Sequence, residues 1–303
     1  MNNIINYYYG INLINIYEYK NIISFNYNGV NYYFVRYDRD KNIIKSLLNI
    51  CVELRNRGIF TNELVCNRFN KYLTPYGEGF FVLVKENVRE HKIDINDILY
   101  IQNNTVNIFF DKNLIRTNTI ELWKNKIDFY EKKSVYLNKK SELIKNTLDY
   151  YIGLGENAIM YLANNSVKIN NIVLSHQRLN DSRESIVFYN PLNYILDSRA
   201  RDIADYIKLL FFYDQKSVES ILSIFKYINF SREEYILLVS RMLFPTYYFD
   251  LIDKIIIFEE DETILKKIID KNDNYINLIK QILYYINYSL RMNIPVIEWI
   301  IKK

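Results

Sequence analysis

The chain has 303 residues, half of them (50%) hydrophobic, so it can bury a sizeable core as one large domain or as two lobes. Its formal net charge is only +4, and Lys and Arg are spread along the chain, which argues against a nucleic-acid-binding protein. The sequence has no run of about 18 apolar residues and does not begin like a signal peptide, so we expect no membrane span and a protein that is cytoplasmic at synthesis.

The first predicted elements are two β-strands, over residues 22–28 and 30–37, which meet at Asn28-Gly29. Asn-Gly between two apolar runs is typical of a tight β-hairpin. A helix is predicted over residues 40–58, because apolar residues recur there every three or four positions and a glycine supplies the stop. The chain therefore opens with strands followed by a helix.

Two further strands are predicted over residues 63–72 and 79–85. A short loop with Pro and Gly joins them, which is typical of an antiparallel pair. The chain then reaches Lys85-Glu86, where the apolar strand pattern ends. We interpret this point, near residue 86, as a hinge between two lobes.

A long, highly charged helical pattern covers residues 119–151. Ser141 before a glutamate is a helix-start signal, so a second helix is expected to begin there. Gly153 and Gly155 are predicted to break this helix, and residues 156–164 to form another short one. The middle of the chain is thus predicted to be helical with interruptions.

The most informative segment runs from residue 172 to 206. An apolar run ends at His176, a polar loop follows, and a second apolar run over residues 186–189 is predicted as a strand leading to Asn190. A helix that carries Asp202 is expected to open near residue 200. This order resembles the active-site segment of small-molecule kinases of the aminoglycoside and choline type.

Those enzymes carry H-x-D-x-x-x-x-N in the loop and a further Asp at the end of the next strand. The first Asp orients or deprotonates the attacking hydroxyl, and the Asn and the later Asp hold Mg²⁺ on the phosphates. Counting from His176 in this chain, the base position is Arg178, the Asn position is Arg183 and the metal position is Asn190. These three substitutions predict a degenerate site.

The chemistry of the substituted residues explains this prediction. A guanidinium does not accept a proton near neutral pH, and it repels Mg²⁺. A neutral amide oxygen, as in Asn190, is a poor replacement for a carboxylate as a ligand of a hard cation. A positioned general base contributes about 10²–10⁴ in rate, so its loss alone is severe.

The remaining residues of the segment are given structural roles. His176 is expected to hold the loop by hydrogen bonds, and Asp202 to accept backbone N–H bonds or cap its helix. Asp181 is the nearest carboxylate left in the loop. It either pairs with Arg178 or Arg183, or is solvated, or acts as a displaced base or metal ligand.

Two charged groups remain open to interpretation. Asp197, Arg199 and Arg201 are candidates for an ion-pair network that fills the former metal site. Arg36 and Glu53 are the nearest candidates for the Lys–Glu pair that kinases place between a strand and a helix of the N-lobe. Arg36 pairs with Glu53 or holds a phosphate under one hypothesis. Under the other it is an edge-strand residue that is solvated or forms an ordinary ion pair.

The C-terminal part is predicted to be almost entirely helical. Ser231 and Glu234 form a capping-box pattern, and Pro245 is expected to end that helix at the preceding residue. The aromatic run that follows is interpreted as core packing, with a partner surface as the alternative. Later helices are predicted over residues 247–259, 261–269 and 274–291. The predicted fold class is α+β.

Two segments carry a more specific resemblance: FYNPLNYILDSRARDIADYIK (188–208) and LLVSRMLFPTYYFDLID (237–253). They are similar to the spore-coat kinase-like family of the CotS and YutH type, within the aminoglycoside phosphotransferase and choline kinase-like superfamily. The resemblance spans about residue 21 to the C-terminus. It implies a two-lobed protein-kinase-like fold, with a small β-rich N-lobe over residues 1–86 and a larger helical C-lobe over residues 87–303.

The resemblance also implies a location in the endospore coat and other coat proteins as partners. We therefore expect a catalytically inactive, kinase-like structural or assembly protein that needs no cofactor. The first alternative is an active ATP- and Mg²⁺-dependent phosphotransferase for a small molecule. The second is a nucleotide- or anion-binding module around Arg36, Arg178 and Arg183 that does not turn over. The sequence leaves the partner's identity and the oligomeric state open.

Overall fold

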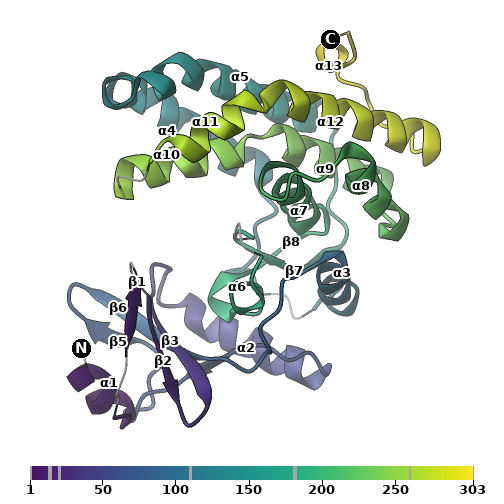
Figure 1. The fold of residues 1–303 in the computed structure, drawn as a ribbon. Helices are drawn as coiled ribbons and strands as arrows, with labels where there is room; N and C mark the ends of the chain where they lie inside the picture. Colours follow the sequence, from purple (N-terminus) through teal and green to yellow (C-terminus); the bar gives the residue numbers. More distant parts are fainter. Residues whose placement is uncertain are drawn as a thin grey trace. The chain divides into compact units, whose positions relative to one another are not determined.

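The computed structural model describes residues 2–12, 16–19, 22–108, 111–179, 183–258 and 261–302 (Figure 1). The chain divides into two compact units. The first unit comprises Met1–Ile115 and Val173–Leu196, and the second comprises Arg116–Ile172 and Asp197–Lys303. An antiparallel sheet lies in the N-terminal part and the C-terminal part is mostly helical, which confirms the α+β prediction.

The first unit contains an antiparallel sheet of six strands, in the order β1-β2-β3-β6-β4 with β5 paired to β6. The strands are β1 (Tyr17–Tyr19), β2 (Ile22–Tyr27), β3 (Val30–Arg36), β4 (Glu63–Val65), β5 (Thr74–Tyr76) and β6 (Gly79–Lys85). The predicted hairpin is confirmed, since Tyr27 pairs with Val30 across a two-residue turn. Both turn residues have positive φ, 52° at Asn28 and 76° at Gly29, as this tight turn requires.

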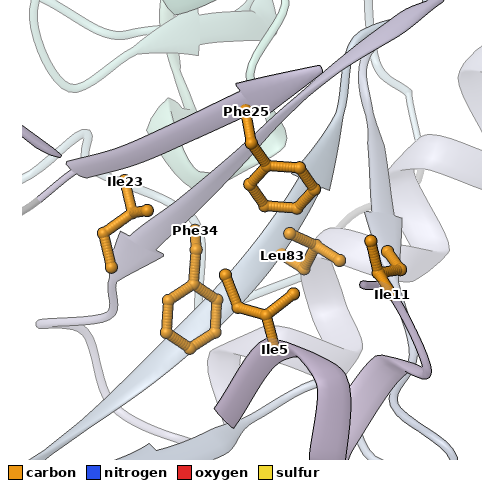
Figure 2. Close-up of a cluster of buried hydrophobic side chains, with 6 residues drawn as sticks. All are labelled: Ile5, Ile11, Ile23, Phe25, Phe34 and Leu83. Carbon is orange, nitrogen blue, oxygen red and sulfur yellow. The ribbon is translucent and has the colours of Figure 1, made fainter. Parts of the chain in front are cut away.

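One face of this sheet is covered by α1 (Asn2–Tyr9), a helix that the sequence patterns did not predict. Six buried apolar residues pack together there, and Figure 2 shows their side chains converging between the helix and the strands: Ile5, Ile11, Ile23, Phe25, Phe34 and Leu83. Ile23 and Phe25 share this face because side chains two apart on a strand point the same way. The N-terminal helix thus completes the core of the sheet.

The rest of the first unit carries the loop that resembles a kinase active site. Its elements are α2 (Ile43–Asn56), α3 (Ile95–Asn104), β7 (Ile172–His176), α6 (Ser185–Phe188), the 3₁₀-helix η1 (Pro191–Asn193) and β8 (Tyr194–Ser198). The predicted helix over residues 40–58 is confirmed by α2. β7 and β8 pair as a separate two-stranded sheet. The last two residues of β8, Asp197 and Ser198, belong to the second unit.

The strand predicted over residues 186–189 is wrong, because this run folds as the single-turn helix α6. Ser185 and Phe188, three residues apart on α6, are the buried ones, which is helical spacing. A run of four apolar residues is too short to separate strand from helix by periodicity. The strand that follows the loop is therefore β8, several residues further along the chain.

The second unit is built from helices. They are α4 (Thr119–Lys140), α5 (Glu142–Asn164), α7 (Ala200–Phe212), α8 (Val218–Ser223), η2 (Ile224–Tyr227), α9 (Arg232–Leu243), α10 (Thr246–Phe258), α11 (Thr263–Asp270), α12 (Asn272–Tyr284), the π-helix η3 (Tyr285–Ser289) and α13 (Glu298–Lys302). α5 packs against both α4 and α9, and α9 packs against α7. None of the described helices is long and apolar enough to cross a membrane.

The predicted break at Gly153 and Gly155 is wrong, because α5 runs through both. A glycine inside a helix costs only about 1 kcal/mol, which packing easily offsets. At Gly155 a Cβ would lie 2.6 Å from Ile127 Cδ1 of α4, so the glycine permits the close approach of these helices. The residues predicted as a separate helix over 156–164 are the end of α5.

Several helix ends follow their predicted signals. Ser141 caps α5 by accepting a hydrogen bond from the Ile144 N–H, and Ser231 and Glu234 form the predicted capping box of α9. α9 ends at Leu243, two residues before Pro245.

The two units differ from the predicted lobes, since residues 87–115 and the segment from Val173 to Leu196 belong with the sheet. The division into kinase-type lobes stays a prediction.

Candidate functional site

His176 ends β7 and is almost fully buried, at 1% exposure. Its Nε2 donates a hydrogen bond to the carbonyl oxygen of Phe188 at 2.8 Å. The ring stacks on Phe188, with centroids 4.2 Å apart, and meets Tyr194 edge-on at 5.6 Å. These contacts tie the start of the loop to α6 and β8, and they support the structural role predicted for this histidine.

Arg178 is the residue predicted to stand at the base position of the kinases that this segment resembles, and its side chain is exposed. Its Nη1 donates to the carbonyl oxygen of Gln177 at 2.9 Å. The backbone around it is held by Asn193, whose amide donates to the Arg178 carbonyl at 2.8 Å and whose Oδ1 accepts from the Arg178 N–H at 3.3 Å. The loop therefore presents a guanidinium at this position on a well-anchored backbone.

Arg183, which was predicted to stand at the position of the metal-binding Asn, is buried. Its Nη1 donates to the carbonyl oxygen of Ile93 at 3.3 Å, and its own carbonyl accepts from the Ile93 N–H at 2.9 Å. Its φ is 55°, a left-handed conformation that is uncommon for a residue with a side chain. Asp181, the proposed displaced base, lies outside the described residues.

The strand from which the former metal position was assigned to Asn190 does not form. Asn190 does not end a strand but caps η1, where its Oδ1 accepts from the Leu192 N–H at 3.0 Å. The assignment depended on a strand over residues 186–189, which is α6. The strand that follows the loop is β8, and the carboxylate at its end is Asp197.

Asp197 is fully buried, at 0% exposure, and both of its oxygens are engaged. Arg241 Nη2 donates to Oδ1 at 3.0 Å and to Oδ2 at 2.8 Å. Arg201 Nη1 donates to Oδ2 at 2.9 Å, and the Ser198 N–H donates to Oδ1 at 2.6 Å. Two cations and a backbone N–H therefore surround a single carboxylate.

The predicted ion-pair network is thus confirmed for Asp197 and Arg201. Arg199 has other contacts, since its Nη1 donates to the Asn229 carbonyl at 3.1 Å and its guanidinium lies over the Phe230 ring. The sequence analysis missed Arg241, the third member. Its signal was an arginine within the buried, mostly apolar second half of α9, at the start of the R-M-L-F-P run.

Arg241 is held from several sides. Its Nη2 also donates to Thr119 Oγ1 at 3.2 Å, and its guanidinium lies 6.0 Å from the centre of the Trp123 ring. Burial lowers the pKa of this guanidinium from its usual value, while the charge of Asp197 opposes that shift. The network therefore joins α4, the end of β8, α7 and α9 inside the second unit.

Arg36 and Glu53 take separate partners. Arg36 Nε donates to Asp38 Oδ1 at 2.9 Å, and Glu53 Oε1 accepts from Arg57 Nε at 3.0 Å. Arg57, the C-cap residue of α2, lies one turn after Glu53, the spacing at which helical ion pairs form. The hypothetical Arg36–Glu53 pair is therefore replaced by two local pairs, and a role of either residue in holding a cofactor stays a prediction.

Two further buried or partly buried residues, Asp202 and Arg39, belong to or contact the segment over residues 172–206. Asp202 is buried in the first turn of α7, where a carboxylate is favoured by the helix N-terminus. Arg39 was missed by the sequence analysis. Its Nη1 donates to the carbonyls of Leu192 and Tyr194, at 3.0 and 2.9 Å, and so fixes η1 and the start of β8 in the first unit.

The fold is the kinase-like fold of aminoglycoside phosphotransferases and choline kinases. It matches an aminoglycoside phosphotransferase from Alicyclobacillus acidocaldarius subsp. acidocaldarius DSM 446, with a TM-score of 0.63, 11% identity and coverage of 91% of this chain and 93% of that chain. A spectinomycin phosphotransferase in complex with ADP and spectinomycin matches with a TM-score of 0.56 and 10% identity, over 97% and 94% of the two chains. Choline kinase LicA from Streptococcus pneumoniae matches with a TM-score of 0.53 and 9% identity, over 90% and 94%.

Within this class, the chain belongs to the family described as "Spore coat putative kinase YutH", which matches residues 2–282. A curated relative, the endospore coat-associated protein YutH of Bacillus subtilis (strain 168), is 28% identical over 165 residues. That alignment covers 47% of this chain and 47% of the relative, so the chain spans about half the length of the relative it matches.

Kinases of this fold hold Mg²⁺ with the strand-end Asp and the loop Asn. In this chain the carboxylate of Asp197 is enclosed by two guanidinium groups, and the Asn position is the buried Arg183. The trio of Asp197, Arg201 and Arg241 has a net positive formal charge, which disfavours a divalent cation. Within the described ranges, no three or more His, Cys, Asp or Glu residues form a metal-binding group. The residues present do not fit Mg²⁺.

Proposed function

We propose that this chain is a kinase-like protein that does not transfer phosphate and that serves a structural or assembly role in the endospore coat. The observation that carries the proposal is the buried carboxylate of Asp197, bound by Arg241 at 2.8 Å and by Arg201 at 2.9 Å. The residue that would hold Mg²⁺ in a related enzyme acts here as the centre of an ion-pair network.

The energetics favour the network over a metal. Removing one partner of a buried ion pair typically costs about 3–5 kcal/mol, because the other charge is left uncompensated. A Mg²⁺ ion at Asp197 would have to displace two such partners, and it would meet their positive charge. The side chain is also completely buried, whereas a metal bound to nucleotide needs access to its phosphates and to water.

The loop supports the same proposal. Arg178 offers no lone pair for the proton of an attacking hydroxyl. His176 is committed to the Phe188 carbonyl and packed between two aromatic rings, so it is poorly placed to replace the base. Without a base and a metal, the two main contributions to phosphoryl transfer are missing.

The coat role rests on the family. The curated relative is named as endospore coat-associated, and the chain belongs to the same family. Under this proposal its partners are other coat proteins, and the kinase-like fold serves as a stable body that displays binding surfaces. Fold alone does not determine function, so the loss of the metal position is what favours a non-enzymatic role.

The proposal is tested by measuring ADP formation from ATP and Mg²⁺ in the presence of a panel of small hydroxylated and amino compounds. The wild-type chain is compared with Asp197→Asn, both first shown to be folded by circular dichroism. We expect neither protein to form ADP above the protein-free rate. ADP formation by the wild type that Asp197→Asn abolishes would establish the phosphotransferase alternative.

A further inference from the structure

The exposed face of α4 carries a regular stripe of apolar and basic residues. Its apolar members are Leu122, Phe129 and Tyr136, which are 40%, 41% and 51% exposed. They are seven residues apart, so they lie on one side of the helix and span about 21 Å along its axis. We call this surface the α4 stripe, with two lysines as its basic members: Lys133 and Lys140.

The two lysines lie over the two aromatic rings of the stripe. Lys133 Nζ is 4.3 Å from the centre of the Phe129 ring, and Lys140 Nζ is 5.5 Å from that of Tyr136. No carboxylate among the described residues lies within ion-pair distance of either lysine. Lys126, nearby on α4, differs, since its Nζ is paired with Asp253 Oδ2 at 2.8 Å. The stripe therefore has two uncompensated positive charges on an aromatic surface.

We infer that the α4 stripe is a docking surface for an amphipathic helix of a partner protein whose apolar residues are flanked by Asp or Glu. The spacing of seven residues selects a helix, because a helical partner that packs alongside α4 meets it once every two turns. The lysines select acidic flanks, since opposite charges on either side of an apolar seam set partner choice and orientation.

Other occupants fit this surface less well. A membrane-bound helix needs a wide apolar face with basic residues beside it, but α4 also exposes Asp128 and Glu131. The same two carboxylates interrupt a basic track of the kind that follows a nucleic-acid backbone. The inference deepens the proposed assembly role and rests on it. The binding test below uses no phosphotransfer readout, so its failure is distinct from failure of the ADP assay.

The probe is a fluorescein-labelled synthetic helix of about 21 residues with Leu at heptad positions and Glu at the flanking ones. A second peptide carries Lys in place of every Glu. Binding to the full chain is measured by fluorescence anisotropy at low salt, where charge pairing is least screened. We expect the Glu-flanked peptide to bind at least about tenfold more tightly than the Lys-flanked one.

Two pairs of matched variants locate the surface. Lys133→Glu/Lys140→Glu is expected to weaken binding of the Glu-flanked peptide about tenfold, whereas the same charge change at exposed lysines of α11, Lys266→Glu/Lys267→Glu, leaves it within about twofold. Phe129→Ala is expected to weaken binding and Met160→Ala, at an exposed residue of α5, to leave it unchanged.

Three results would overturn the inference. The first is equal binding of the two peptides, and the second is equal loss in the α4 and α11 charge variants. The third is a different occupant: binding to vesicles of phosphatidylcholine and phosphatidylglycerol without peptide preference, or a dimer in sedimentation that Phe129→Ala dissolves. Melting curves of all variants confirm that lost binding does not reflect lost folding.

Discussion

Arg241 Nη2 lies 3.0 Å from one oxygen and 2.8 Å from the other oxygen of the fully buried Asp197. The contact connects α9 to the end of β8, across 44 residues of sequence. Arg201, the second residue of α7, completes the trio. The ion pair thus holds the end of β8 to α9 within the second unit.

Arg241→Met is expected to lower the free energy of unfolding by about 3–5 kcal/mol, because Asp197 then keeps only one cationic partner in a buried site. Urea denaturation measures the loss. The control is Arg55→Met, at an exposed arginine of α2, which is expected to change stability by less than about 0.5 kcal/mol. Equal effects of the two substitutions would contradict the structural role of the pair.

The double variant Asp197→Leu/Arg241→Met separates the pair from its surroundings. If the two side chains act through each other, their effects are not additive, and the double variant is less destabilised than the sum of the single ones by about 0.5–3 kcal/mol. The same urea experiment gives this coupling energy. Simple additivity would mean that the two residues contribute independently.

Lys208 on α7 is a second buried cation with a structural task. Its Nζ donates to the carbonyls of Arg241 and Phe244, at 2.5 and 3.2 Å, and to Thr246 Oγ1 at 3.1 Å. Lys208→Met keeps the stem but leaves these acceptors without their donor, so we expect a loss of about 2–4 kcal/mol. Lys267→Met, at an exposed lysine, serves as the control in the same denaturation series, and a similar stability for both variants would contradict the assignment.

The two glycines of α5 should respond differently to alanine. At Gly153 a Cβ meets nothing within 4 Å, so Gly153→Ala is expected to stabilise the protein by about 0.5–1 kcal/mol through helix propensity. At Gly155 the Cβ would lie 2.6 Å from Ile127 Cδ1 and 3.4 Å from Phe244 Cε2, so crowding offsets that gain. Thermal melting should rank Gly153→Ala above Gly155→Ala, and the reverse order would exclude close packing at Gly155.

His91 provides a prediction about pH. Its Nδ1 bonds the Arg89 carbonyl at 3.0 Å and its Nε2 bonds Asp97 Oδ1 at 3.2 Å. The backbone contact, followed by Asp97, raises the pKa of the imidazole above its usual value of 6.5. Since the folded pKa is the higher one, the stabilisation is fully present below the unfolded pKa and is lost as pH rises through the folded pKa.

This shift is measured by an NMR titration of the imidazole Cε1–H, with His91→Gln used to assign the two histidine signals. Asp97→Asn should move the His91 pKa downward, because it removes the negative charge that favours the imidazolium. The side chain is 41% exposed, so solvent screens the effect on stability and the titration is the more direct measurement. A His91 pKa at or below its usual value would contradict the contacts described.

Local signals predicted local structure well. Asn28-Gly29 predicted the hairpin because its positive φ angles are a property of those two residues, and Ser231 and Pro245 delimited α9 for similar reasons. α1 was missed because its stability comes from burying Ile5 against strands far along the chain. No pattern within residues 2–9 reports that contact.

The candidate site was predicted only in part. Asp197 lies near the end of β8 and Arg201 lies at the start of α7, so the short turn between these two elements brings the two side chains together. Arg241 is distant in sequence, and only the packing of α9 on α7 brings it to the carboxylate. The error at Asn190 arose because four apolar residues fit a strand and a helix equally well, which shifted the expected strand end away from Asp197.

The central claim is that the carboxylate of Asp197 forms a structural ion pair and does not bind magnesium. Thermal melting with about 1 mM ATP, with and without Mg²⁺, tests this claim most directly. Ligand at about 100 times its Kd would stabilise the folded protein by about 2.7 kcal/mol. The account predicts no shift in Tm that depends on Mg²⁺. A shift that requires both ATP and Mg²⁺ would contradict it, and a shift with ATP alone would indicate nucleotide binding without a metal.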